Sequence, residues 1–141
     1  MKKITLLQLL LLALIIFVSC EKEGQLTKTT SSQISTAAIL KYSGVFTPTS
    51  GISGSGNVKI SLDNGIYKLS LENYTIETGP DLKVYLSKTA SITSDFVNLG
   101  NANPSTIYTI PQQIDLSVYK YVLIHCQQYN HLFAVATLIQ N

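Results

Sequence analysis

The chain has 141 residues, enough for one ordinary domain, and carries ten basic residues against eight acidic ones. All ten basic residues are lysines. Arginine is the side chain best suited to phosphates and base edges, so this composition argues against a nucleic-acid partner.

The first 19 residues are typical of a signal peptide. Lys2 and Lys3 precede an apolar run over residues 6–18, which is interrupted by one polar residue. A run of about 13 residues is shorter than the roughly 20 that a membrane-spanning helix needs. Residues 17–20 (Phe-Val-Ser-Cys) resemble the lipobox of bacterial lipoproteins, in which the cysteine becomes the lipid-bearing first residue. We expect cleavage before Cys20, with a transmembrane anchor as the alternative.

This N-terminus predicts three segments. Residues 1–19 form the signal peptide, residues 20–40 a lipidated and flexible tether, and residues 41–141 one folded domain. Acyl chains on Cys20 would hold the protein on a membrane of the cell envelope, which we take to be the periplasmic or surface-exposed side of the outer membrane. Removal of Lys2 and Lys3 leaves as many acidic as basic residues, so the mature chain is close to neutral.

Alternating patterns begin after the tether. Apolar residues at 58, 60 and 62 and at 67, 69 and 71 alternate with polar ones, as expected for half-buried strands. Asp63-Asn64-Gly65 lies between the two runs, and Asn-Gly is the favoured pair for a type I′ turn. The sequence therefore predicts a β-hairpin here.

The remaining strand candidates follow in order. Residues 82–86 alternate, residues 96–99 and 106–110 are short candidates, and residues 119–128 and 132–139 are richer in apolar side chains. The last two are expected to be central strands buried on both faces. No segment after the signal peptide has a helical period, so we expect an all-β domain, a single antiparallel β-sandwich or barrel-like structure of about seven to nine short strands.

A series of short motifs resembles the DM-thirteen domain, also called the electron-transfer DM domain, over nearly all of residues 42–139. These motifs are Gly44-Val45-Phe46, Gly56-Asn57-Val58, Gly79-Pro80-Asp81-Leu82, Leu99-Gly100, Tyr108-Thr109-Ile110-Pro111, His125-Cys126 and Phe133-Ala134-Val135-Ala136.

The resemblance implies a small extracellular or envelope β domain with a role in electron transfer. It further implies that Cys126 is a redox thiol or a ligand for a prosthetic group such as haem. The chain departs from the family pattern at Tyr74, where phenylalanine is more usual, and at His125, where an aromatic residue often stands. Residues 47–55 also lack a histidine that many members carry.

The strand pattern gives Cys126 a definite setting. Val122, Ile124 and Cys126 share one strand face, and His125 points to the other. A two-residue loop would place Cys126 opposite Phe133, and a four-residue loop opposite His131. In either register His131, Phe133 and Val135 lie on the cysteine's face, whereas an odd-length loop or a bulge would reverse this.

Two functions from different classes remain open. In one, Cys126 is a redox thiol or cofactor ligand with His131 as its neighbour, since a nearby imidazolium favours the thiolate. In the other, Cys126 is core packing in a cell-surface interaction or ligand-binding module, because free cysteines are often buried. No hydrolase motif, metal-ligand cluster or covalent haem motif marks a stand-alone enzyme. The expected partners are the membrane, through Cys20, and a redox or surface protein.

Overall fold

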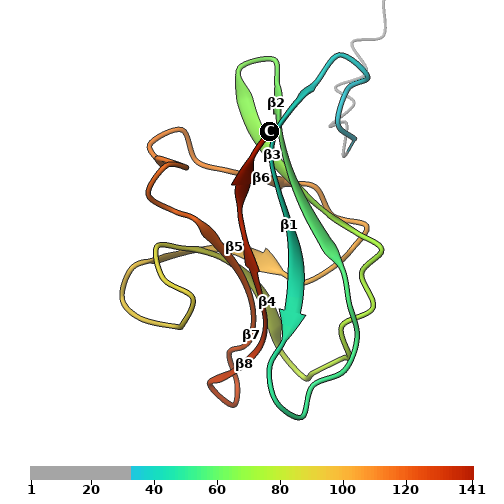
Figure 1. Cartoon of the computed structure of the whole chain (residues 1–141), viewed down its shortest axis with the longest axis vertical. Coiled ribbons are helices and arrows are strands. Elements are labelled where there is room, and N and C mark those ends of the chain that lie inside the picture. The colour runs from blue at the N-terminus through green and yellow to red at the C-terminus, as the bar shows by residue number, and fades with distance from the viewer. Residues whose placement is uncertain (1–32) are drawn as a thin grey trace, which may run out of the picture. The chain divides into compact units, whose positions relative to one another are not determined.

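The computed structural model describes residues 33–141, which fold into nine β-strands and contain no helix (Figure 1). In chain order the strands are β1 (Ile39–Pro48), β2 (Asn57–Asp63), β3 (Ile66–Glu72), β4 (Leu82–Ser87), β5 (Phe96–Asn101), β6 (Tyr108–Thr109), β7 (Tyr121–Cys126), β8 (His131–Thr137) and β9 (Ile139–Gln140). None of the described residues belongs to a helix long and apolar enough to cross a bilayer. The signal peptide, Cys20 and most of the tether lie outside the described residues.

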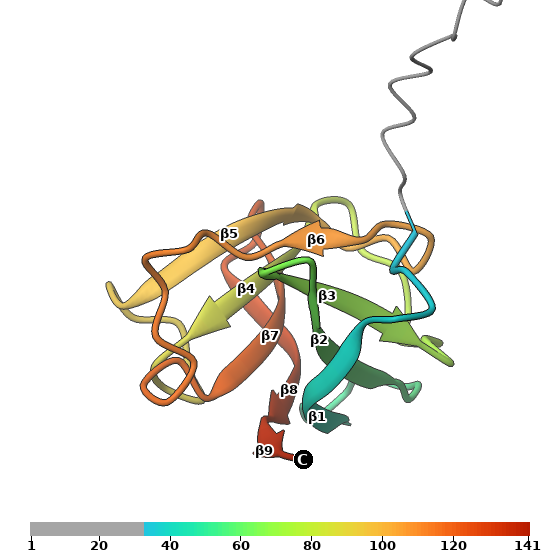
Figure 2. The ribbon, with the colours of Figure 1, turned by 90° about the horizontal axis from the view of Figure 1, so that it is seen from above.

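The strands form one antiparallel, barrel-like sheet. Their order is β5-β4-β7-β8-β1-β2-β3-β6, and β9 pairs with β1. Figure 2 shows the sheet curling until β5 and β6, the two ends of this order, lie side by side. The predicted all-β class is confirmed, and a nearly closed barrel is the architecture that the domain adopts.

Strand β1 joins the two halves of the barrel. Its first part pairs with β2 from Ile39 to Val45, and its last three residues pair with β8. A strand of ten residues spans roughly 33 Å, so β1 runs the length of the barrel. The described chain therefore enters at the β2–β3 turn and reaches the β7–β8 turn at the opposite end, as Figure 1 shows.

The predicted hairpin is confirmed between β2 and β3. Asn64 and Gly65 have φ values of 51° and 80°, which a type I′ turn requires at its two central positions. The Asp63 carboxylate, buried at this turn, accepts hydrogen bonds from Lys68 Nζ at 2.7 Å, Ser35 Oγ at 2.7 Å and Asn64 Nδ2 at 2.9 Å. The bond from Ser35 fastens the chain preceding β1 to this hairpin.

The core fills the barrel interior with the inward side chains of the strands. Strand β7 is its centre, because it pairs with β4 on one side and β8 on the other. Its residues from Val122 to Cys126 are all buried, as expected for a central strand covered on both faces.

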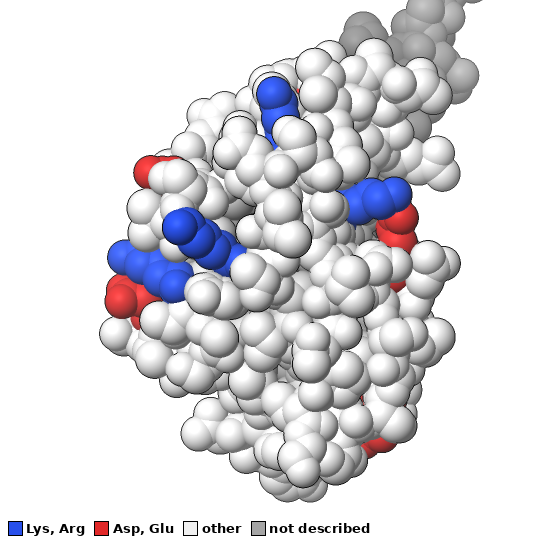
Figure 3. Space-filling model, viewed as in Figure 1, with Lys and Arg blue, Asp and Glu red and all other residues white. Residues whose placement is uncertain are grey.

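Charged side chains on the barrel surface are largely paired with opposite charges. Lys59 lies 2.7 Å from the Glu72 carboxylate across β2 and β3, and Lys83 lies 2.6 Å from that of Asp81. On the face drawn in Figure 3, lysines and carboxylates lie next to each other and uncharged side chains cover most of the remaining surface. This face therefore offers no broad positive patch of the kind that a nucleic-acid backbone requires.

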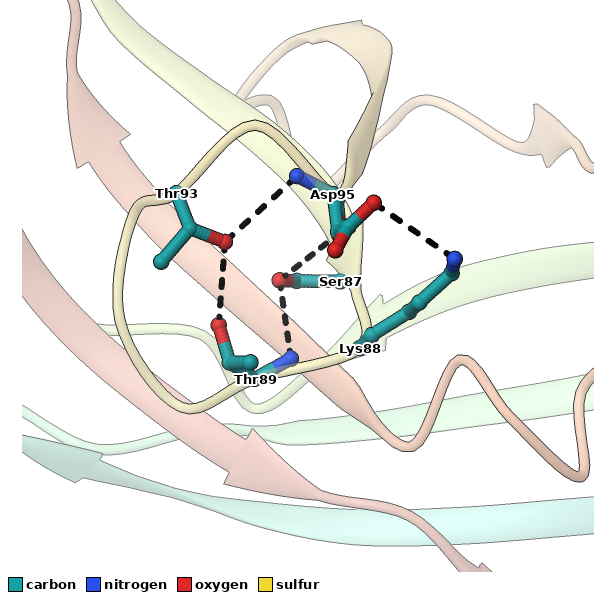
Figure 4. Close-up of polar contacts among 5 residues, drawn as sticks. All are labelled: Ser87, Lys88, Thr89, Thr93 and Asp95. Carbon is teal, nitrogen blue, oxygen red and sulfur yellow. Dashed lines mark hydrogen bonds and ion pairs between the residues drawn. The ribbon is translucent and has the colours of Figure 1, made fainter.

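The β4–β5 loop is held by its own polar groups (Figure 4). Ser87 Oγ accepts from Thr89 N at 3.2 Å, Thr93 Oγ1 accepts from Asp95 N at 3.4 Å, and Lys88 lies 3.5 Å from the Asp95 carboxylate. These bonds lie within one loop and join mostly exposed groups, so they account for its shape and mark no site.

Asp63 should make the domain sensitive to acid. The hydrogen bonds from Lys68 and Ser35 lower the pKa of Asp63 from 3.8 to about 2. Its ionised form therefore contributes stability that is complete above pH 3.8 and is lost as the pH falls through about 2.

In urea unfolding at pH 7 and pH 3, we expect Asp63→Asn to be less stable than wild type at pH 7 and to lose less stability on acidification. Asp95→Asn, which removes an exposed carboxylate, is the control. If Asp63→Asn lost as much stability on acidification as wild type, another carboxylate would be the source of the acid sensitivity.

Candidate functional site

Cys126 is the last residue of β7 and lies at the end of the barrel remote from the chain's entry. It pairs with Leu82 across β4 and with His131 across β8. Directly opposite residues on antiparallel strands share a face, so Leu82 lies beside the cysteine. The Cys126 side chain is 0% exposed and belongs to the main core cluster.

The end of β7 is covered by a cap of Gly79, Leu82 and Phe133. A Cβ atom on Gly79 would lie 2.9 Å from Leu82 Cδ2 and 3.0 Å from Phe133 Cζ, so the chain passes directly over these side chains. The next residue after Cys126, Gln127, donates its N–H to the Asp81 carbonyl at 2.9 Å, and Thr49 N donates to the Phe133 carbonyl at 2.9 Å. The strand end is thus tied to the loops on both sides.

His131 stands opposite Cys126 in the ladder, and its ring packs on Phe133. Its side chain is exposed, and its ring packs edge-on against Phe133 at a centroid distance of 5.4 Å. The Cys126 sulfur is a free, buried thiol and makes no hydrogen bond within the described chain. The structure therefore brings the two predicted residues into register without joining them.

The register follows the four-residue loop and adds a bulge. Cys126 faces His131 as the longer loop predicts, but the ladder shifts between Ile124 and His125. Phe133 still packs in the core with the cysteine, whereas Val135 pairs with Leu123 on the opposite face. The expectation that Val135 shares the cysteine's face is wrong, because the bulge reverses the alternation beyond it.

His125 occupies a second buried cluster on the outer face of β7. It is 4% exposed, and its ring centroid lies 5.6 Å from that of Tyr85, which stacks on Phe96 at 4.5 Å. Burial lowers the pKa of His125 below 6.5; a side-chain hydrogen bond with Asn130 opposes this shift, and the charge of His131 adds to it. This cluster was not predicted from the sequence. The apolar residues on both faces of β4 and β7 could have indicated that the outer face is covered as well.

Two buried side-chain atoms have no hydrogen-bond partner among the described residues, Tyr74 Oη and His125 Nδ1. Burial also raises the pKa of Tyr74 to about 12. Both residues stand where the sequence departs from the resembled family towards a more polar side chain. Each atom carries an unmet hydrogen-bonding capacity that a phenylalanine would not have.

A haem does not fit the residues present. A haem held by Cys126 would require a pocket that opens onto this sulfur, but the Cys126 side chain is 0% exposed and lies in the core beside Leu82. A cavity of about 450 Å³ lies at the same end of the barrel, and its lining includes neither a cysteine nor a histidine. Residues 33–141 also contain no group of three His, Cys, Asp or Glu side chains suited to a metal ion.

The buried His125 predicts a loss of stability in mild acid. Because its folded pKa lies below 6.5, the unfolded chain binds the proton more readily, and the free energy of unfolding falls as the pH drops below 6.5. We expect urea unfolding to show a less stable wild type at pH 5 than at pH 7.5. His125→Phe should lose this difference and the matched His131→Phe should keep it. Equal pH responses in the two variants would show that His125 is not the group responsible.

Comparison with known protein families gives a match. The family model described as Electron transfer DM13 matches residues 46–138, which run from the last three residues of β1 to just beyond the end of β8 and include Cys126. No curated protein and no solved structure was found to match the chain. The match covers most of the chain and agrees with the resemblance seen in its motifs, so this protein belongs to the electron transfer DM13 family.

Proposed function

We propose that this protein is a lipid-anchored electron-transfer accessory domain of the cell envelope that uses Cys126 as its redox group. Family membership supports the redox role. The observation that carries the proposal is the position of Cys126, the one thiol within residues 33–141, at the end of the barrel opposite the chain's entry. If the barrel is held through Cys20 and the tether, the Cys126 thiol lies about one barrel length from the end at which the described chain enters the barrel.

A single thiol limits the chemistry. Cys126 cannot close a disulfide within the described domain, so disulfide formation has to join it to a sulfur from outside. Cys126 would lose its proton and attack a partner's disulfide as the thiolate, one S–S bond would form as the other breaks, and the leaving sulfur would take up a proton. Since the Cys126 sulfur is buried, this step requires the end of the barrel around it to open, which we expect to happen at the cap of Gly79, Leu82 and Phe133.

The burial of Cys126 also favours a second candidate function. A cysteine that is 0% exposed and packed with Ile124 and Phe133 can serve as a small apolar core residue. In that case the domain is a surface interaction module, and its family's redox role rests on other groups. The two functions differ in whether Cys126 reacts while the domain remains folded.

The redox proposal predicts reversible mixed-disulfide formation in the folded protein. The lipidated protein, in which the Cys20 sulfur carries its lipid group and cannot react, should gain and lose one glutathione at Cys126 when it is equilibrated with reduced and oxidised glutathione, as followed by intact mass spectrometry. Leu82→Ala should react at least tenfold faster, because it removes part of the cap, at a cost of about 2 kcal/mol in stability. Leu99→Ala is the matched control, since Leu99 is a half-buried leucine packed on the same core outside the cap.

Two further variants complete this test. Cys126→Ala should gain no glutathione, and Cys20→Ala should move the protein from the membrane fraction to the soluble fraction of cells. A wild-type protein that stays unmodified until it is denatured would establish the packing role. A Cys20→Ala chain that remains with the membrane would overturn the lipid anchor.

A further inference from the structure

A cavity of about 450 Å³ opens beside the cap, between the segment leading into β4 and the segment following β5. This volume falls within the range of small-molecule sites. Its lining is about equally polar and apolar, with two polar side chains along one edge. The walls include Tyr74, Ile76, Leu82, Ala102 and Pro104, and the polar edge includes Asp81 and Asn101.

The polar edge is neutral overall. Lys83 Nζ lies 2.6 Å from Asp81 Oδ1 and donates to Asn101 Oδ1 at 2.6 Å, so one ammonium bridges both side chains and compensates the carboxylate. The Asp81 side chain is still 36% exposed, which leaves it accessible as a hydrogen-bond acceptor. An edge of this kind favours an uncharged ligand with a hydrogen-bonding group, because a charged ligand would lose hydration without gaining an opposite charge.

Tyr74 adds an aromatic ring to the lining of the cavity. Its hydroxyl oxygen is enclosed by the protein, so a ligand in the cavity would contact the ring and not the hydroxyl. Proline and aromatic walls suit a flat ring better than a sugar, whose hydroxyls point in all directions around it.

We propose that this cavity binds a small uncharged molecule that contains an aromatic ring with one hydroxyl or carbonyl group. The ring would lie between the Tyr74 and Pro104 walls, and its polar group would face the edge formed by Asp81 and Asn101. The site lies next to Leu82 but makes no use of the Cys126 sulfur, so it stands independently of the redox proposal.

Binding of 2-naphthol tests this site. The probe is a neutral hydroxylated aromatic, and its fluorescence can be excited without interference because the chain contains no tryptophan. We expect the full chain to bind it with a Kd on the order of 0.1–1 mM, as suits a ligand of this size. Ala102→Leu, which fills the cavity, should weaken binding at least tenfold, whereas Ala90→Leu in the exposed β4–β5 loop should leave it unchanged.

Further variants separate this site from the thiol and test the chemistry of the ligand. Cys126→Ala should bind 2-naphthol like wild type, so failure of the redox proposal would not affect the result. Tyr74→Phe keeps the ring and removes only the enclosed hydroxyl, so it should bind 2-naphthol like wild type. Wild-type binding weaker than about 10 mM, or equal binding by Ala102→Leu, would overturn the site. Displacement of the probe by methyl glucoside at similar concentrations would overturn the assigned ligand class.

Discussion

The pairing of β7 with β4 on one side and β8 on the other is the constraint on which the rest of the structure depends. It buries every residue from Val122 to Cys126, so both faces of the strand need apolar cover. The barrel interior covers one face, and the stacked rings of Tyr85 and Phe96 lie on the other with His125. Cys126 is therefore held by two strand pairings at once, and its burial follows from the architecture.

Much of this architecture can be predicted from local sequence. The Asp63-Asn64-Gly65 turn is encoded by residues that tolerate positive φ, and alternation locates most strands. The bulge opposite Ile124 could not be predicted, because one unpaired residue leaves no periodic signal and is fixed by contacts across strands. The cavity was missed for a similar reason, since Leu82 and Ala102 are distant in sequence and meet only when β4 and β5 pair.

At the candidate site, the family membership and the burial of Cys126 favour different functions. Membership of an electron-transfer family favours a redox role. The Cys126 sulfur, in contrast, has no exposure and no hydrogen bond within the described residues, which are the surroundings of a core residue. A redox role is compatible with a buried sulfur if the cap of Gly79, Leu82 and Phe133 opens locally while β7 stays paired. The cap lies at a strand end and among loops, where local opening costs less than unfolding the barrel. A protected thiol of this kind would react only with a partner that binds the open form or induces the opening.

The urea dependence of Cys126 labelling tests most directly whether the thiol is reached in the folded protein. With a small neutral reagent such as N-ethylmaleimide, the slope of the labelling free energy against urea reports how much surface each opening exposes. Local opening of the cap predicts labelling that is nearly independent of urea well below the unfolding transition. Labelling whose slope equals that of global unfolding at all urea concentrations would show that the thiol is reached only by unfolding, and the redox role of Cys126 would be contradicted.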